Sequence, residues 1–174
     1  MGPLSSEQHR GLHVHPTLAV TPERVPLGVL DAWMWARDDD DFATQKPNDR
    51  PIEEKESARW LEGYQRMNET AQLFPDTLLV YMGDREADIY ELFAEHAQQS
   101  GPRAELLIRV AQTQRKLMNG DYLLPSVEKQ TPLGEIEFNF PGSETQPART
   151  VIQTLRAAEI ELKPRTAATE RCHR

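Results

Sequence analysis

The chain has 174 residues, of which 38% are hydrophobic, so it is long enough for one domain with its own core. No apolar stretch approaches the roughly 20 residues that a membrane span requires, and the N-terminus lacks the basic and apolar regions of a signal peptide. The only cysteine, Cys172, can form no internal disulfide and is expected to be inert. These features predict a soluble cytoplasmic protein without a membrane partner.

The formal net charge of -8 is unevenly distributed along the chain. Residues 1–101 contain 19 acidic and 9 basic residues, whereas residues 102–174 contain 9 acidic and 11 basic residues. A negative protein is a poor partner for nucleic acid, because affinity for phosphate depends on Lys and Arg. The uneven distribution is compatible with an acidic chemical site beside a mildly basic part, although charge runs also occur on ordinary solvated faces.

The N-terminal segments 11–20 and 25–36 are rich in β-forming residues and flank a proline-containing turn, which predicts a pair of strands. Four alternating side chains of the second segment are expected to share one face, on which the two indoles can cover a sheet: Val29, Asp31, Trp33 and Trp35. Residues 37–51 should form a surface loop. The aspartates at 38–41 lack the glycine and spaced ligands of a calcium loop, so we expect them to be solvated.

The middle of the chain alternates between helical and strand-like patterns. Residues 52–74 have the period of a helix with one buried stripe: Trp60, Leu61, Tyr64, Met67, Ala71 and Phe74. Residues 77–82 and 106–110 are short apolar runs, typical of strands that are buried on both faces. Between them, Asp84 begins a second amphipathic pattern with an inward side: Ile89, Leu92, Phe93 and Ala97. This order predicts an α/β fold with a parallel crossover.

After residue 112 the pattern changes to one-sided antiparallel strands. Ile136, Phe138 and Phe140 alternate with polar residues, and residues 150–162 resemble a weaker strand. We expect a β-rich insertion over residues 113–165 that has too few strands to be stable alone. Residues 166–174 have no hydrophobic partner and should fray.

Asp84 is the leading candidate for a chemical role, because it follows a predicted buried strand at the edge where open α/β sheets bind ligands. A carboxylate in this position can hold Mg²⁺ or Mn²⁺, which prefer oxygen ligands. The competing interpretation is that Asp84 only caps the next helix. His13 and His15 could face one metal ion, but the sequence offers no third ligand.

The string around Asp84, residues 80–89 (VYMGDREADI), resembles a known family of enzymes. It is similar to the segment that carries the second catalytic aspartate in bacterial insertion-sequence DDE transposases of the insertion-sequence-four type. Further matches occur in the family's order: residues 10–15 (RGLHVH), residues 54–60 (EKESARW), and residues 107–109 (LIR) followed after a one-residue offset by Arg115 and Lys116. The resemblance covers most of residues 5–165.

The resemblance implies an RNase H-like core over residues 1–112, which would cut and rejoin DNA with two divalent ions held by three carboxylates. Asp84 would be the middle ligand. The first aspartate is expected on a strand upstream of Met1 and the glutamate on a helix beyond Arg174, because no residue of this chain matches either motif. The DNA-recognition region of the family is also missing, so the chain resembles an internal fragment that is inactive alone.

Three cations follow the predicted strand at 106–110 and would stand near the same edge of the sheet: Arg109, Arg115 and Lys116. The resemblance implies that they contact the phosphates of transposon-end DNA, on which the intact protein could dimerise. The alternative is that they form ordinary surface salt bridges.

Two other functions remain open from the sequence. One is a small Mg²⁺-dependent nuclease or phosphatase, in which Asp31 on a neighbouring strand would supply the second carboxylate beside Asp84. The other is a non-catalytic interaction remnant, in which an unpaired strand edge would bind a partner.

Overall fold

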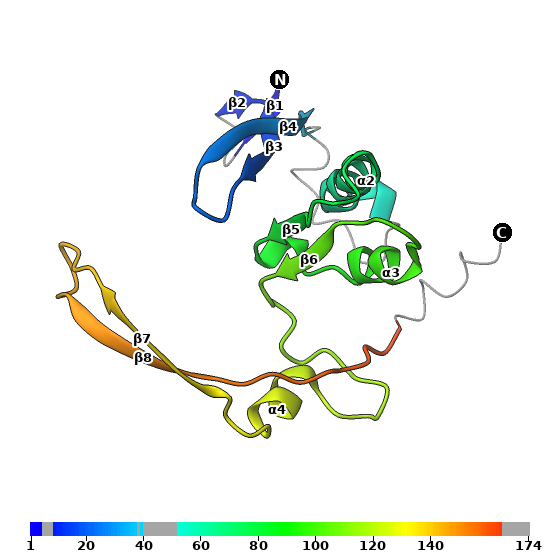
Figure 1. The fold of residues 1–174 in the computed structure, drawn as a ribbon. Helices are drawn as coiled ribbons and strands as arrows, with labels where there is room; N and C mark the ends of the chain where they lie inside the picture. Colours follow the sequence, from blue (N-terminus) through cyan, green and yellow to red (C-terminus); the bar gives the residue numbers. More distant parts are fainter. Residues whose placement is uncertain (5–8, 38, 40–51, 165–174) are drawn as a thin grey trace. The chain divides into compact units, whose positions relative to one another are not determined.

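The computed structural model describes residues 1–4, 9–37, 39 and 52–164. The chain divides into two compact units, Met1–Arg109 and Val110–Arg174. Each unit contains helical and strand structure, so the predicted α/β class is confirmed at this level (Figure 1). Within the described ranges, no helix combines the length and apolarity that crossing a membrane would require.

The first unit contains three small two-stranded sheets and two α-helices among its described residues. Its strands are β1 (Gly2–Pro3), β2 (Arg10–Gly11), β3 (His13–Val20), β4 (Pro26–Trp35), β5 (Val80–Gly83) and β6 (Glu105–Ile108). Its helices are α2 (Ala58–Leu73) and α3 (Tyr90–Gln98), with 3₁₀ turns η1 (Ile52–Glu54) and η2 (Arg85–Ala87).

The predicted strand pair near the N-terminus is confirmed as the antiparallel hairpin β3–β4. The prediction that Val29 shares a face with Asp31 is wrong, because the register shifts from Thr17↔Asp31 to Leu18↔Val29 and leaves Leu30 as an extra residue. Such a bulge reverses the side-chain alternation beyond it. Val29 is therefore 60% exposed, whereas the two tryptophans of β4 remain half-buried.

The long helix begins later than its hydrophobic pattern predicts. Turn-type hydrogen bonds occupy residues 52–58, and α2 starts at Ala58. The buried stripe is confirmed at four of the predicted positions: Trp60, Tyr64, Met67 and Ala71. Phe74 lies beyond the helix end and is exposed, so the last member of the predicted stripe is wrong.

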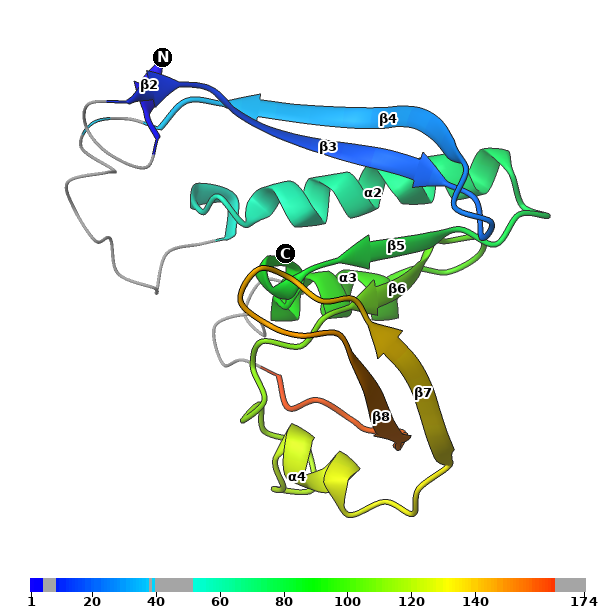
Figure 2. The same cartoon turned by 90° about the vertical axis from the view of Figure 1, so that its left-hand side faces the viewer.

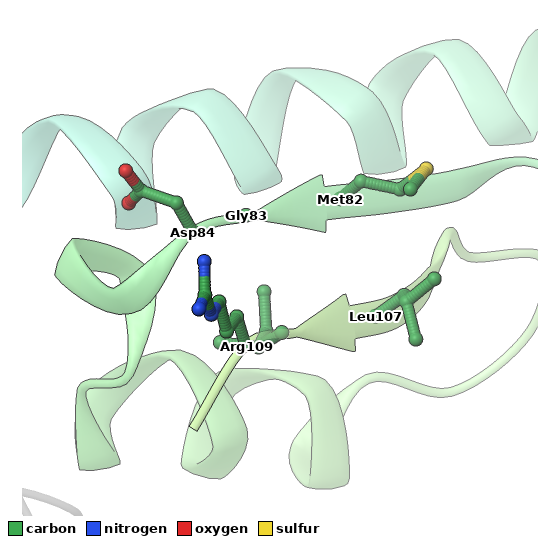
Figure 3. A pocket seen from close by; sticks show the side chains of 6 residues that line it. Met82, Gly83, Asp84, Leu107 and Arg109 are labelled. Atoms are coloured by element: carbon green, nitrogen blue, oxygen red, sulfur yellow. The ribbon is translucent and has the colours of Figure 1, made fainter. Parts of the chain in front are cut away.

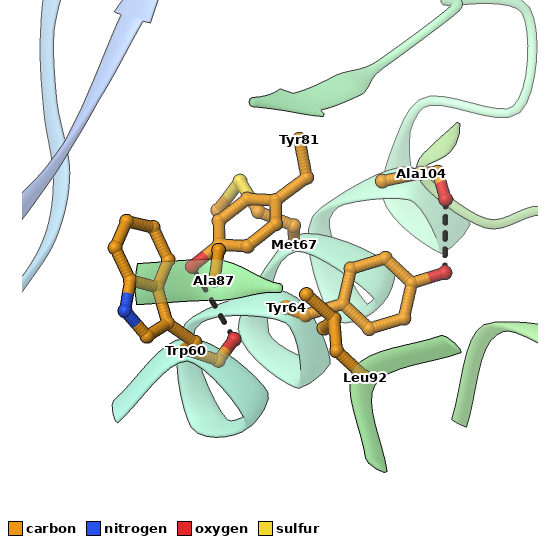
Figure 4. Close-up of a cluster of buried hydrophobic side chains, with 7 residues drawn as sticks. All are labelled: Trp60, Tyr64, Met67, Tyr81, Ala87, Leu92 and Ala104. Atoms are coloured by element: carbon orange, nitrogen blue, oxygen red, sulfur yellow. Dashed lines mark hydrogen bonds between the residues drawn. The ribbon is translucent and has the colours of Figure 1, made fainter. Parts of the chain in front are cut away.

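The core of the first unit is a cluster of aromatic and small side chains between α2, β5 and α3 (Figure 4). Its buried members are Trp60, Tyr64, Met67, Tyr81, Ala87, Leu92 and Ala104. The Tyr64 hydroxyl donates to the Ala104 carbonyl at 2.9 Å, and the Tyr81 hydroxyl donates to the Trp60 carbonyl at 3.3 Å. These bonds pair the tyrosine hydroxyls of the core with backbone acceptors.

Strands β5 and β6 pair in parallel, as the helix–strand alternation predicts. The prediction that both strands are buried on both faces is wrong. Tyr81 faces the core, but its neighbour Met82 is 68% exposed and Leu107 of β6 is 56% exposed. Helices cover one face of this short sheet only, so side chains of the alternate positions point to solvent.

The segment after β5 does not enter an α-helix directly. Asp84 is followed by the 3₁₀ turn η2, and α3 begins at Tyr90. Leu92 is fully buried as expected, whereas Ala97 is exposed and lies outside the core.

The second unit contains the short helix α4 (Leu123–Glu128), which the sequence pattern did not predict, and an antiparallel hairpin. The hairpin strands are β7 (Gly134–Phe140) and β8 (Arg149–Leu155). The predicted antiparallel strand that contains Ile136, Phe138 and Phe140 is confirmed, and the predicted strand at 150–162 is shorter than expected. The apolar side chains of β7 stay about 40% exposed.

The predicted frayed tail, including Cys172, lies outside the described residues, as does most of the predicted loop at 37–51.

Candidate functional site

Asp84 stands directly after β5, at the carboxyl end of the strand, and its side chain is exposed (Figure 3). This is the position that the sequence predicts for a reachable carboxylate. One carboxylate oxygen accepts a hydrogen bond from the Glu86 amide at 2.9 Å, so Asp84 also caps η2. Capping engages Oδ1 only, and the two interpretations of Asp84 are therefore compatible.

Arg109 stands directly after the carboxyl end of β6, in the same position that Asp84 has after β5. Its amide donates to the Gly83 carbonyl at 3.0 Å, which extends the parallel pairing and fixes its backbone beside the end of β5. Both residues line one open pocket of about 440 Å³ together with apolar side chains of the two strands (Figure 3). Neighbouring parallel strands bring their carboxyl ends to the same edge, and the predicted juxtaposition of Asp84 and Arg109 is observed.

The other two predicted DNA contacts lie in the second unit. Lys116 is exposed and forms a β-bridge with Tyr122, and the side chain of Arg115 is half-buried. Asp84 lies in the first unit, so a common surface of these two cations with Asp84 stays a prediction.

Three segments that are far apart in the sequence converge close to Asp84. The His15 ring from β3 packs edge-on against Trp60 of α2, with 4.4 Å between ring centroids. Arg59, the preceding residue on the helix, forms an ion pair with Glu86 in η2. The segments at 10–15, 54–60 and 80–89, which carry the family resemblance, therefore contact one another in space.

The pKa of His15 is affected by charged groups from the same segments. Burial is the largest effect and lowers the pKa of the imidazole, and the Arg59 guanidinium lowers it further. Three carboxylates oppose this shift: Glu86, Asp84 and Asp31. The net effect is a lowered pKa, which favours the neutral form of the imidazole.

Glu56 in the EKESARW segment has a clear structural role that the sequence alone did not assign. Its carboxylate accepts hydrogen bonds from the Trp35 indole at 3.2 Å and from both Nε and Nη2 of Arg37. The bond from Arg37 is the main cause that lowers the Glu56 pKa to about 2. Only the presence of Glu56 in the family-like segment could have drawn attention to it.

The residues near Asp84 do not by themselves make a two-ion centre. Within the described part of the chain, no group of three or more His, Cys, Asp or Glu side chains could hold a metal ion. Asp31, the candidate second carboxylate, contacts Arg66 at 3.5 Å and its side chain is only 18% exposed. His13 stacks on Trp35 with 5.0 Å between ring centroids. Asp84 therefore fits a metal ion only as one ligand of a larger set.

No protein-family model matches this sequence, and no curated protein matches it either. The family resemblance consequently rests on the quoted motifs and on their arrangement in space.

Proposed function

We propose that the chain is the central part of the catalytic core of an insertion-sequence-four-type DNA transposase, with an RNase H-like sheet in the first unit and part of a β-rich insertion in the second. The observation that carries this proposal is the convergence of the three family-like segments around Asp84. A motif match by chance gives no reason for His15, Arg59 and Glu86 to meet at the end of β5.

In this proposal Asp84 is one of the carboxylates that hold Mg²⁺ or Mn²⁺, and the ions supply the charge that activates the attacking oxygen and stabilises the leaving oxygen of a DNA phosphate. The chain's own residues contribute position and charge. The end of β5 and the cap of η2 hold the Asp84 carboxylate at a rigid edge, and Arg109 places a cation beside it where a phosphate would lie.

The test uses a protein in which this chain is extended by an upstream strand with the first aspartate and a downstream helix with the glutamate. Strand nicking of transposon-end DNA is measured with and without Mg²⁺. We expect nicking by the extended protein and none by its Asp84→Asn variant, because the amide removes a charged ligand while retaining the cap. Equal nicking by both proteins would rule out the assigned role of Asp84.

The control for folding is the thermal midpoint of the two extended proteins. Asn caps helices about as well as Asp, so the midpoints should agree closely. An Asp84→Ala variant, which loses the cap as well, should lower stability by about 1 kcal/mol and separates the capping role from the proposed ligand role.

A further inference from the structure

Arg59, the second residue of α2, is only 9% exposed although it carries a full charge. Its guanidinium lies over two indoles, 5.3 Å from the ring centroid of Trp35 and 5.8 Å from that of Trp60. Trp35 belongs to β4 and Trp60 to α2, and Figure 2 shows this helix beside both the β3–β4 hairpin and β5. A guanidinium packed on aromatic faces retains few conformations, so this charge is held in one place.

The two Nη atoms of Arg59 make its polar contacts. Nη1 donates to the Glu56 carbonyl at 2.6 Å, and Nη2 donates to the carboxylate of Glu86. The first bond holds the guanidinium to the turn that precedes its own helix, and the second joins α2 to η2. Arg59 therefore connects a rigid helix to the turn that follows Asp84.

The ion pair of Arg59 with Glu86 should be more effective than an ordinary surface pair. Exposed pairs contribute little, because two long side chains must be ordered for one contact. Here the Arg59 side chain is 10% exposed and is already ordered by the indoles, so only Glu86, at 65% exposure, has to be ordered. The conformation of η2 at Glu86 thus depends on a side chain of α2.

The backbone of Glu86 holds Asp84, while its side chain is held by Arg59. The Glu86 amide donates to Asp84 Oδ1 at 2.9 Å, and the Glu86 carboxylate accepts from Arg59 Nη2. Because both contacts belong to one residue, fixing the side chain restricts the direction of the amide. The orientation of the Asp84 carboxylate is therefore linked to Arg59.

Gly83 allows η2 to lie close to the end of β5. A Cβ atom at Gly83 would collide with the Cβ of Ala87 and would lie 3.3 Å from the Trp60 ring. Ala87 is fully buried and belongs to the core cluster with Trp60 (Figure 4). The turn is thus anchored at Ala87, directly after Glu86, and at Asp84, two residues before it.

We propose that Arg59 is a positioning residue for Asp84: acting through Glu86, it fixes the orientation of the carboxylate at the end of β5. The benefit for metal binding rests on the proposed function, because a carboxylate that is oriented in advance loses less freedom when an ion binds. A direct contact of Arg59 with DNA phosphate is less favourable, since the guanidinium is buried and two of its nitrogens are already engaged.

The first experiment uses the 174-residue chain without metal. Amide hydrogen exchange and the pH titration of the amide proton shift are measured by NMR at residue 86 in the native chain and in Glu86→Gln. The variant keeps the amide and the side-chain length but loses the charge that pairs with Arg59. We expect its residue-86 amide to exchange about two- to fivefold faster relative to the intrinsic rate. Its proton shift should also respond less to the ionisation of Asp84.

Glu69→Gln is the matched control, because it removes the same charge from an exposed position of α2 and should leave the residue-86 amide unchanged. Arg59→Met removes the other charge and keeps a long apolar side chain against the indoles. The double variant should exchange no faster than the faster single variant, because both substitutions break one contact. Additive effects, or an unchanged residue-86 amide in Glu86→Gln, would overturn the proposal. Glu86→Gln alone decides the outcome if Arg59→Met fails to fold.

The second experiment uses the extended protein and separates this inference from the proposed function. In Glu86→Gln the Mg²⁺ concentration for half-maximal nicking should rise about two- to fivefold, with the rate at saturating Mg²⁺ nearly unchanged. An unchanged Mg²⁺ dependence beside an inactive Asp84→Asn variant would overturn the positioning role. Nicking that survives Asp84→Asn would refute the proposed function instead, and the exchange measurements would still decide whether Arg59 fixes the carboxylate.

Discussion

Glu56 connects the β3–β4 hairpin to the start of α2, because its carboxylate accepts hydrogen bonds from Trp35 and Arg37 two residues before the helix begins. The same residue lies in the segment 54–60 that resembles the transposase family. Glu56 therefore has a positioning role: it holds the hairpin against the helix turn that contacts His15.

The low pKa of Glu56 predicts an acid-sensitive part of the stability. A folded-state pKa of about 2, below the ordinary 4.5, means that the carboxylate stabilises the fold above about pH 4.5 and that this contribution is lost as the pH falls toward 2. Denaturant titrations at several pH values should show this loss in the native chain. In a Glu56→Gln variant, the slope of stability against pH in this interval should be smaller.

The proposed contact of Arg109 with a DNA phosphate predicts how its removal changes DNA affinity and the salt dependence of that affinity. In the extended protein, Arg109→Ala should weaken binding to transposon-end DNA and reduce the slope of log affinity against log salt by about one, because one phosphate contact is lost. Arg24→Ala, in the turn between β3 and β4, is the matched control and should leave the slope unchanged. A slope that does not respond to Arg109→Ala would count against a phosphate contact.

At the scale of elements, the sequence patterns correctly predicted those features of helices and strands that depend on neighbouring residues in the chain. The extended conformation of β7, most of the buried stripe of α2 and the parallel pairing of β5 with β6 are confirmed. The first two depend mainly on patterns within short windows of the sequence. The bulge at Leu30 depends on strand pairing, and the exposed face of β5 depends on which layers cover the sheet. Local patterns alone therefore gave the wrong face for Val29 and the wrong burial for Met82.

The same distinction applies to the site. The proximity of Asp84 and Arg109 follows from the rule that parallel strands end at one edge, and it could be predicted. The contacts of Trp60 with His15 and of Arg59 with Glu86 join elements separated by many residues, and no periodicity encodes them. Only the family-like motifs indicated that these segments belong together.

The one-sided burial of β5 and β6 can be tested by paired truncations. Leu92→Ala removes a fully buried side chain and should lower the free energy of unfolding by about 2–5 kcal/mol. Met82→Ala changes an exposed position of β5 and should alter it by less than about 0.5 kcal/mol. Denaturation curves of the two variants give the comparison. A large loss in Met82→Ala would mean that another layer covers this face.

At the scale of the whole molecule, the net charge and the residues near Asp84 are unfavourable for binding and cleavage of DNA by this chain alone. The net charge of -8 repels phosphate, and the pocket beside Asp84 offers the single cation Arg109 among its lining residues. A two-ion centre needs several protein ligands that reach the same ions. The described residues do not bring such a group together.

We therefore predict that the 174-residue chain alone neither nicks nor joins DNA. In-line attack on a phosphate needs both ions fixed, and ions held by one aspartate and water lack the defined geometry that lowers the barrier. Purified chain is incubated with supercoiled plasmid and transposon-end duplex in Mg²⁺ or Mn²⁺ and compared with its Asp84→Asn variant. Both should leave the DNA intact. Metal-dependent nicking by the native chain that disappears in Asp84→Asn would instead favour a small self-sufficient nuclease, and Asp31→Asn would then be the variant that identifies its second carboxylate.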